Sequence, residues 1–138
     1  MASILKVDDL RGNTAAGNIT ITSEGGSATM QLQQGLAKAW NNYTQVSTVS
    51  ITDSFNVSSI SDVGTGMAQT SYTNSMANAA YVVSGSHNQP GGNSASIISG
   101  YDNSADFATG TVTVSTFNAS SGRLDVSLSQ MAVNGDLA

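Results

Sequence analysis

The stretch TGTVTVSTFNASSGRLDVSLSQMAV, residues 109–133, decides the fold class because apolar and polar residues alternate along much of it. Alternation with a period of two is typical of a β-strand that buries one face. The alternation is strictest over 111–114 and 124–128. The segment between them, 118–122, suits a hairpin loop with glycine in the left-handed conformation. This part of the sequence therefore predicts two antiparallel strands.

Similar short segments recur along the chain at a spacing of roughly ten residues, and turn residues separate them. The cluster Ser61 to Gly66 is one such turn. The apolar run Tyr81-Val82-Val83 predicts a central strand or one buried on both sides. A β-bulge would explain the phase shift that brings Met131 and Val133 into the last strand. The expected strands cover 18–22, 48–52 with a continuation through Phe55 and Val57, 67–72, 81–83, 97–98, 111–114 and 124–133.

Residues 28–40, ATMQLQQGLAKAW, allow two interpretations. Leu32, Leu36 and Trp40 are four residues apart, which places them on one face of a helix. Gly35 interrupts this helix at a cost of about 1 kcal/mol relative to alanine. Alternatively, a helix ends near Gly35 and a strand then runs from 37 to 43. The fold class we expect is mainly β, an antiparallel β-sandwich of jelly-roll type. Whether it also contains one short helix stays undecided between the two interpretations.

The N-terminal segment is too short and too polar to form a core alone, so we expect residues 1–27 to be an extended docking arm. Glu24-Gly25-Gly26-Ser27 would form the turn or hinge at its end. Residues 28–138 would then form the sandwich domain. Apolar side chains of the arm would add strands to another protein. The candidate docking residues are Ile4, Leu5, Val7, Leu10, Ile19 and Ile21.

The composition offers little catalytic chemistry. Ser, Thr, Asn and Gly make up 62 of the 138 residues, and there is one His, one Trp, one Pro and no Cys. Catalysis generally needs a nucleophile, an acid–base pair or a metal, so we expect a protein that binds and is not an enzyme, without cofactor or metal. A polysaccharide hydrolase or lyase would need two suitably spaced carboxylates, and no motif pairs the nine acidic residues.

Charge and hydropathy exclude other classes of partner. The net charge is −5 and the four cationic residues are scattered, so we expect no binding to nucleic acid. No run of 18 apolar residues is present, so we expect no membrane insertion. The first residues lack the apolar core of a signal peptide, which predicts a protein that is not exported.

Binding residues are expected on loops. His87 lies in a loop rich in glycine and asparagine, where solvent exposure is the simpler interpretation. The segment Asp102 to Asp106 resembles half of a calcium loop but lacks its glycine and distal glutamate. Tyr101 is the best loop-borne aromatic for stacking against a sugar, although most aromatic residues of a small chain serve the core. We expect a receptor-facing tip with the candidates His87, Asn88, Gln89, Asn93, Tyr101, Asp102, Asn103 and Asp106.

Several motifs together resemble a module of tail-fibre and related virion proteins of tailed bacteriophages. They are GLAKAWNNY (35–43), ITDSFNVSSISDVGTG (51–66), SYTNSMANAAYVVSG (71–85) and STFNASSGRLDVSLSQMAV (115–133). The resemblance covers about residues 35–134, and ILKVDDLRGNTAAGNITI (4–21) is similar to the leader found ahead of such modules. Asn41-Asn42 departs from the usual alternation after the tryptophan, and we expect no long shaft or tail-binding domain.

The resemblance implies a virion protein that is made in the host cytoplasm, and we expect a homotrimeric fibre-type protein on the tail that attaches to the host. Trimerisation would bury apolar strand faces that include Val112, Val114 and Val126. Further partners would be other virion proteins, through the arm, and a host surface glycan or protein. Two alternatives stay open: a capsid decoration or head-fibre protein that stabilises the shell, and a polysaccharide-binding or polysaccharide-degrading tip.

Overall fold

The computed structural model describes residues 4–15, 18–88, 97–99, 106–118 and 122–138. The chain divides into two compact units, residues 1–36 and 37–138. The division falls after Leu36 and not at residue 27, because the strand that begins at Thr29 pairs with a strand from the expected arm. The first unit is therefore a small element with its own backbone pairing.

A two-stranded hairpin forms the centre of the first unit. Strands β1 (Thr20–Thr22) and β2 (Thr29–Gln31) pair antiparallel around the predicted turn. A single 3-10 turn, η1 (Gln33–Gly35), follows β2. The helix over residues 28–40 is thus wrong, and the interpretation with a strand after Gly35 is closer. From Ala39 to Thr44, buried residues alternate with exposed or half-buried ones, which is the period of a strand.

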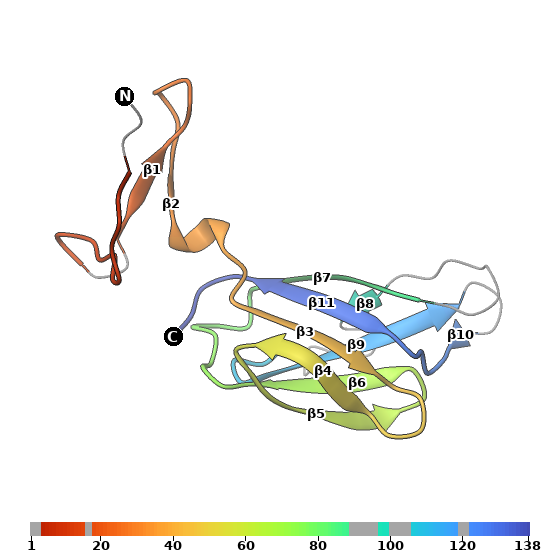
Figure 1. The fold of residues 1–138 in the computed structure, drawn as a ribbon. Coiled ribbons are helices and arrows are strands. Elements are labelled where there is room, and N and C mark those ends of the chain that lie inside the picture. Colours follow the sequence, from red (N-terminus) through yellow and green to blue (C-terminus); the bar gives the residue numbers. More distant parts are fainter. Residues whose placement is uncertain (1–3, 16–17, 89–96, 100–105, 119–121) are drawn as a thin grey trace. The chain divides into compact units, whose positions relative to one another are not determined.

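The second unit is a sandwich of two antiparallel sheets (Figure 1), which confirms the predicted fold class. No α-helix occurs among the described residues. One sheet has the order β4-β3-β11-β7 and the other the order β10-β9-β6-β5, with β8 also paired to β9. The strands are β3 (Ala39–Thr44), β4 (Ser50–Phe55), β5 (Val57–Gly64), β6 (Met67–Tyr72), β7 (Val82–His87), β8 (Ile97–Ser99), β9 (Thr111–Asn118), β10 (Gly122–Arg123) and β11 (Ser129–Asn134).

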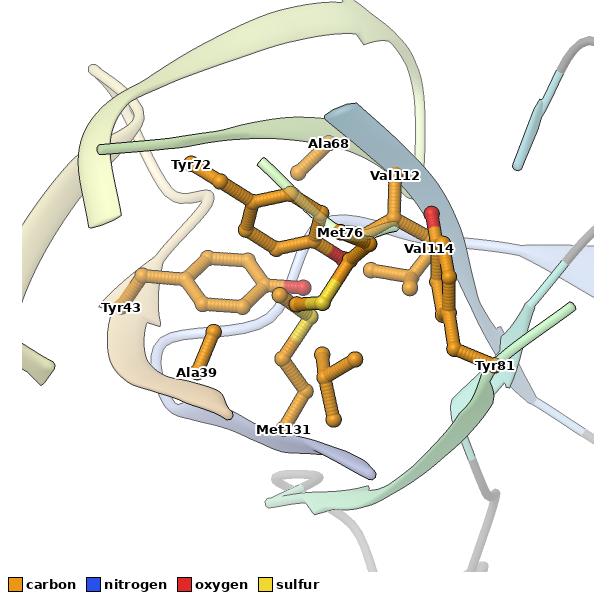
Figure 2. Packing of buried hydrophobic residues seen from close by; sticks show 10 residues of the cluster. Ala39, Tyr43, Ala68, Tyr72, Met76, Tyr81, Val112, Val114 and Met131 are labelled. Atoms are coloured by element: carbon orange, nitrogen blue, oxygen red, sulfur yellow. The ribbon is translucent and has the colours of Figure 1, made fainter. Parts of the chain in front are cut away.

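The core lies between the sheets, where each contributes every second residue of its inner strands. Figure 2 shows the rings of Tyr43, Tyr72 and Tyr81 directed inward around Met76. Tyr72 and Tyr81 meet edge to face with ring centroids 6.1 Å apart. Burial raises the pKa of all three hydroxyl groups, because a charged phenolate would lose its hydration in this interior. The remaining core residues are Ala39, Ala68, Val112, Val114, Met131 and Val133.

Asn56 marks the point where the chain passes from one sheet to the other. The predicted strand through Phe55 and Val57 is broken there, because Asn56 has a left-handed backbone with φ of 55°. Its Nδ2 donates to the carbonyl oxygen of Lys38 at 2.9 Å, and its Oδ1 accepts from the backbone N–H of Asn74 at 2.7 Å. The Asn56 side chain therefore forms hydrogen bonds with backbone groups that have no partner strand at the point where the chain changes sheet.

The strand predicted over 124–128 is also wrong. After the short strand β10, the chain crosses between the sheets before β11 begins at Ser129. Val126 lies in the interior during this crossing, and its carbonyl accepts from the backbone N–H of Gln45 at 2.8 Å. A change of sheet, and not a bulge, therefore produces the phase shift before Met131. The loop prediction is correct in one respect, since Gly122 has a φ of 83°.

Three smaller expectations also need correction. The predicted turn over 61–66 is confined to Thr65 and Gly66, because β5 continues to Gly64. Within the run 81–83, Tyr81 is buried but precedes the strand, and Val82 and Val83 begin β7, which is an edge strand in which Val82 is 66% exposed. The three valines assigned to a trimer interface, Val112, Val114 and Val126, are at most 1% exposed in the chain itself. They already lie inside the sandwich, so they are not available to an interface.

Candidate functional site

The outer face of the sheet β4-β3-β11-β7 carries two parallel rows of side chains. Strand β3 turns Ala39, Asn41 and Tyr43 inward, so Trp40 and Asn42 face outward. The strand register sets their neighbours on the other three strands. The aromatic row consists of Phe55, Trp40, Ala132 and Ser84, and the polar row consists of Asp53, Asn42, Gln130 and Ser86.

A hollow of about 350 Å³ lies on this face beside Trp40. It forms because the aromatic row changes from large to small side chains across the sheet: Trp40 stands directly opposite Ala132, and Ala132 opposite Ser84. Gly85 contributes only backbone atoms to the lining. The hollow therefore has an indole on one side, small residues at its base and the polar row along its length.

The polar row offers both donors and acceptors to this hollow. Ser86 Oγ lies 3.5 Å from Gln130 Oε1, a long hydrogen bond in which the hydroxyl donates. This contact uses only Oε1 of Gln130 and does not occupy the two hydrogens on Nε2. Oδ1 of Asn42 is shielded from solvent and has no hydrogen-bond partner among the described residues. A buried acceptor without a partner costs about 1–3 kcal/mol, so a hydrogen bond to this oxygen would be favourable once rotation of the side chain exposes it.

Charge is nearly absent from these two rows. Asp53 is the single ionisable residue among the eight, and it lies at the edge strand β4. Its Oδ1 accepts from the backbone N–H of Ser54 at 2.8 Å. These eight side chains therefore offer apolar contact and neutral hydrogen bonds, and none of them is a cation that could attract an anion.

Two of the predicted loop residues lie at the end of β7 and have structural contacts. His87 is half-buried and pairs in register with Ser129. Asn88 joins β7 to the segment before β11: its Oδ1 accepts from the backbone N–H of Leu128 at 2.8 Å, and its Nδ2 donates to Ser127 Oγ at 3.1 Å. Asn88 therefore holds two strand ends together as well as lying at the surface.

Asp106 lies near the other end of β7. It precedes Phe107, whose ring packs on Tyr81 with centroids 5.2 Å apart, just before β7 begins. Asp106 and His87 are thus not brought together into one tip. The remaining candidates for that tip, Gln89, Asn93, Tyr101, Asp102 and Asn103, lie outside the described residues.

The predicted docking residues all belong to the first unit, where the described residues include none that is buried. Ile4 and Leu5 are 77% and 76% exposed, and Val7 and Leu10 are also exposed. On the hairpin, Ile21 pairs with Met30, and both line a hollow of about 310 Å³. Ile19 is half-buried, and its carbonyl accepts from the backbone N–H of Leu32 at 2.7 Å.

The part of the chain that the structure describes contains no group of three or more His, Cys, Asp or Glu residues placed to hold a metal ion. Within the same residues, no helical segment has the length and hydrophobicity that crossing a bilayer requires. Comparison of the chain with models of protein families, with curated proteins and with solved structures gave no match.

Sequence reasoning did not find the two rows as a site. One interpretation of the sequence places Trp40 on a helix face, and its neighbours in the rows, Ala132 and Ser84, are distant in sequence. Residues 39–43 give no clear signal in the sequence, because the apolar Trp40 faces outward and the polar Asn41 faces inward. The opposite residues follow only from the register of four strands.

Proposed function

We propose that the chain is a structural protein of a tailed-bacteriophage virion, which assembles through its N-terminal unit and displays the sandwich on the tail for attachment to the host. The observation that carries this proposal is the exposure of the first unit. A small hairpin with its large apolar side chains in water gains much by burying them against a partner.

The resemblance to tail-fibre modules supports the phage assignment, and the sandwich fold agrees with it. Two of the motifs coincide with corners that fix the fold. SFNVSS surrounds the left-handed Asn56, and GTG contains the turn between β5 and β6. We retain the homotrimer as part of the proposal, with the interface placed outside the three buried valines.

Immunogold electron microscopy of phage particles that encode the chain tests this function, with antibodies raised against the purified protein. We expect gold on the tails. Gold on the heads would replace tail display by the capsid-decoration alternative, and particles without label would overturn a virion role. Sedimentation of the purified chain checks the trimer, and a mass equal to one chain at micromolar concentration would overturn it.

The role of the first unit has its own test in incorporation of the protein into particles. The double substitution Ile4→Ser and Leu5→Ser removes apolar surface from the first unit without touching the sandwich. We expect this variant to be lost from purified particles by at least tenfold, as measured by immunoblot. Lys6→Gln is the matched control, because it changes an exposed polar residue of the same segment. Normal incorporation of the double variant would contradict docking through this unit.

A further inference from the structure

We propose that the hollow beside Trp40 binds a neutral saccharide. The inference rests on the proposed function, since it names the ligand class by which a displayed sandwich would attach to a host. The site is the outer face of the sheet β4-β3-β11-β7, and it is distinct from the loop tip that the sequence predicted.

The first argument is the exposed aromatic pair. Trp40 and Phe55 stand directly opposite each other on neighbouring strands and are 37% and 53% exposed. Cross-strand neighbours on one face have Cβ atoms about 5 Å apart, so the two rings form one apolar surface. Large aromatic side chains gain little from staying in water. The C–H face of a pyranose ring is a natural partner for such a surface.

The second argument is the room beside the indole. The hollow of about 350 Å³ is at the small end of the range of about 300–1,000 Å³ that is usual for ligand sites. It exists because Ala132 and Ser84 occupy positions where larger side chains would close it. Its size is suitable for a short saccharide.

The third argument is the polar row. Consecutive side chains on one face of a strand are about 7 Å apart, so the polar row borders a ring that lies on the aromatic row. Gln130 and Asn42 carry amides, which donate and accept, and Ser86 carries a hydroxyl. Sugar hydroxyls also donate and accept. A small rotation of Asn42 would turn its unsatisfied Oδ1 toward a ligand hydroxyl.

The charge of the site selects a neutral ligand over other classes. The two rows contain no cation, so a phosphorylated, sulfated or uronic-acid ligand would lose hydration without gaining an ion pair. Asp53 adds an acceptor at the rim and repels anions. A second copy of the chain is the competing occupant, and it would bury the same rings.

The experiment uses the intrinsic fluorescence of Trp40, which is the only tryptophan of the chain. The full-length protein is titrated with neutral oligosaccharides: cellohexaose, maltohexaose, mannohexaose and chitohexaose. Ala132→Leu fills the hollow and keeps Trp40. Ala79→Leu is the matched control, because it makes the same change at an exposed position outside the two rows. Melting curves of both variants confirm that they fold.

We expect at least one of these saccharides to change the emission of Trp40 in a saturable way. Ala132→Leu should weaken that binding at least tenfold, and Ala79→Leu should leave it unchanged. An emission unaffected by all four saccharides would overturn the proposal, and so would equal binding by Ala132→Leu. An emission that changes with protein concentration alone would assign the face to a second copy. Immunogold labelling tests the virion role independently of these titrations. Absence of saccharide binding would therefore overturn the proposed site without deciding the virion role.

Discussion

At the scale of single residues, Tyr43 and Tyr81 are both buried but use their hydroxyl groups differently. The Tyr81 hydroxyl lies 3.0 Å from the carbonyl oxygen of Ala108 and 2.9 Å from that of Thr111, so it donates to backbone at the start of β9, where the Thr111 carbonyl also accepts from the N–H of Ala108. The Tyr43 hydroxyl is near Ser129, yet neither of these two hydroxyl groups has a well-formed hydrogen bond. Removal of the hydroxyl group should therefore change the free energy of unfolding differently at Tyr43 and at Tyr81.

We expect Tyr81→Phe to lower the free energy of unfolding by about 1–2 kcal/mol, because carbonyl groups lose a donor inside the protein. Tyr43→Phe removes a hydroxyl that lacks a partner, so it should leave stability within about 1 kcal/mol of the parent or raise it. Urea unfolding measures the free energy of unfolding of both variants, which keep the aromatic ring and differ from the parent only by one hydroxyl group. A larger loss in Tyr43→Phe than in Tyr81→Phe would contradict the hydrogen bonding described.

At the scale of elements, the turn between β5 and β6 is fixed by its fit against the chain around β10. Gly66 has a φ of 65°, its N–H donates to Asp125 Oδ1 at 2.7 Å, and its carbonyl accepts from the N–H of Thr116 at 2.8 Å. A Cβ at Gly66 would come within 2.6 Å of the backbone nitrogen of Leu124. This turn therefore requires glycine for its conformation and also for its close approach.

Gly66→Ala should lower the free energy of unfolding by about 3 kcal/mol or more, since backbone on two sides must move in addition to the left-handed strain. Gly122→Ala is the matched control. Gly122 has a φ of 83°, but a Cβ there meets nothing within 4 Å, so only the strain of about 1–2 kcal/mol applies. Thermal and urea unfolding give both values. Equal losses in the two variants would show that close approach contributes nothing.

At the scale of the whole molecule, the two units differ in how much they bury. Every buried residue among the described part of the chain lies at or after Lys38. The first unit is held by the β1–β2 ladder and a few side-chain hydrogen bonds, such as Gln31 Nε2 to Asn18 Oδ1 at 2.7 Å. A short hairpin without a hydrophobic core is marginally stable in water, so this unit should open far more often than the sandwich.

Limited digestion with trypsin measures this difference, because the four cleavage sites are divided between the units. Lys6 and Arg11 are exposed, whereas Lys38 is 3% exposed and begins the sandwich. We expect cleavage after Lys6 and Arg11 at least tenfold faster than cleavage after Lys38, as followed by mass spectrometry. Early cleavage after Lys38 would indicate that the sandwich, and not the hairpin, opens first.

The sequence alone determined the class of fold, because alternation in segments such as Thr111 to Val114 survives any arrangement of the strands. It also determined the apolar character of Ile4 and Leu5. The tertiary structure decided the features that depend on contacts between residues far apart in sequence. The predicted strand ends at Asn56, where the chain passes between the sheets, and residues 124–128 cross between the sheets in place of forming a strand. Val82 lies on an edge strand and is exposed. The tertiary structure also placed Trp40 beside Ala132, since strand register is set by packing of the whole sandwich and not by local pattern.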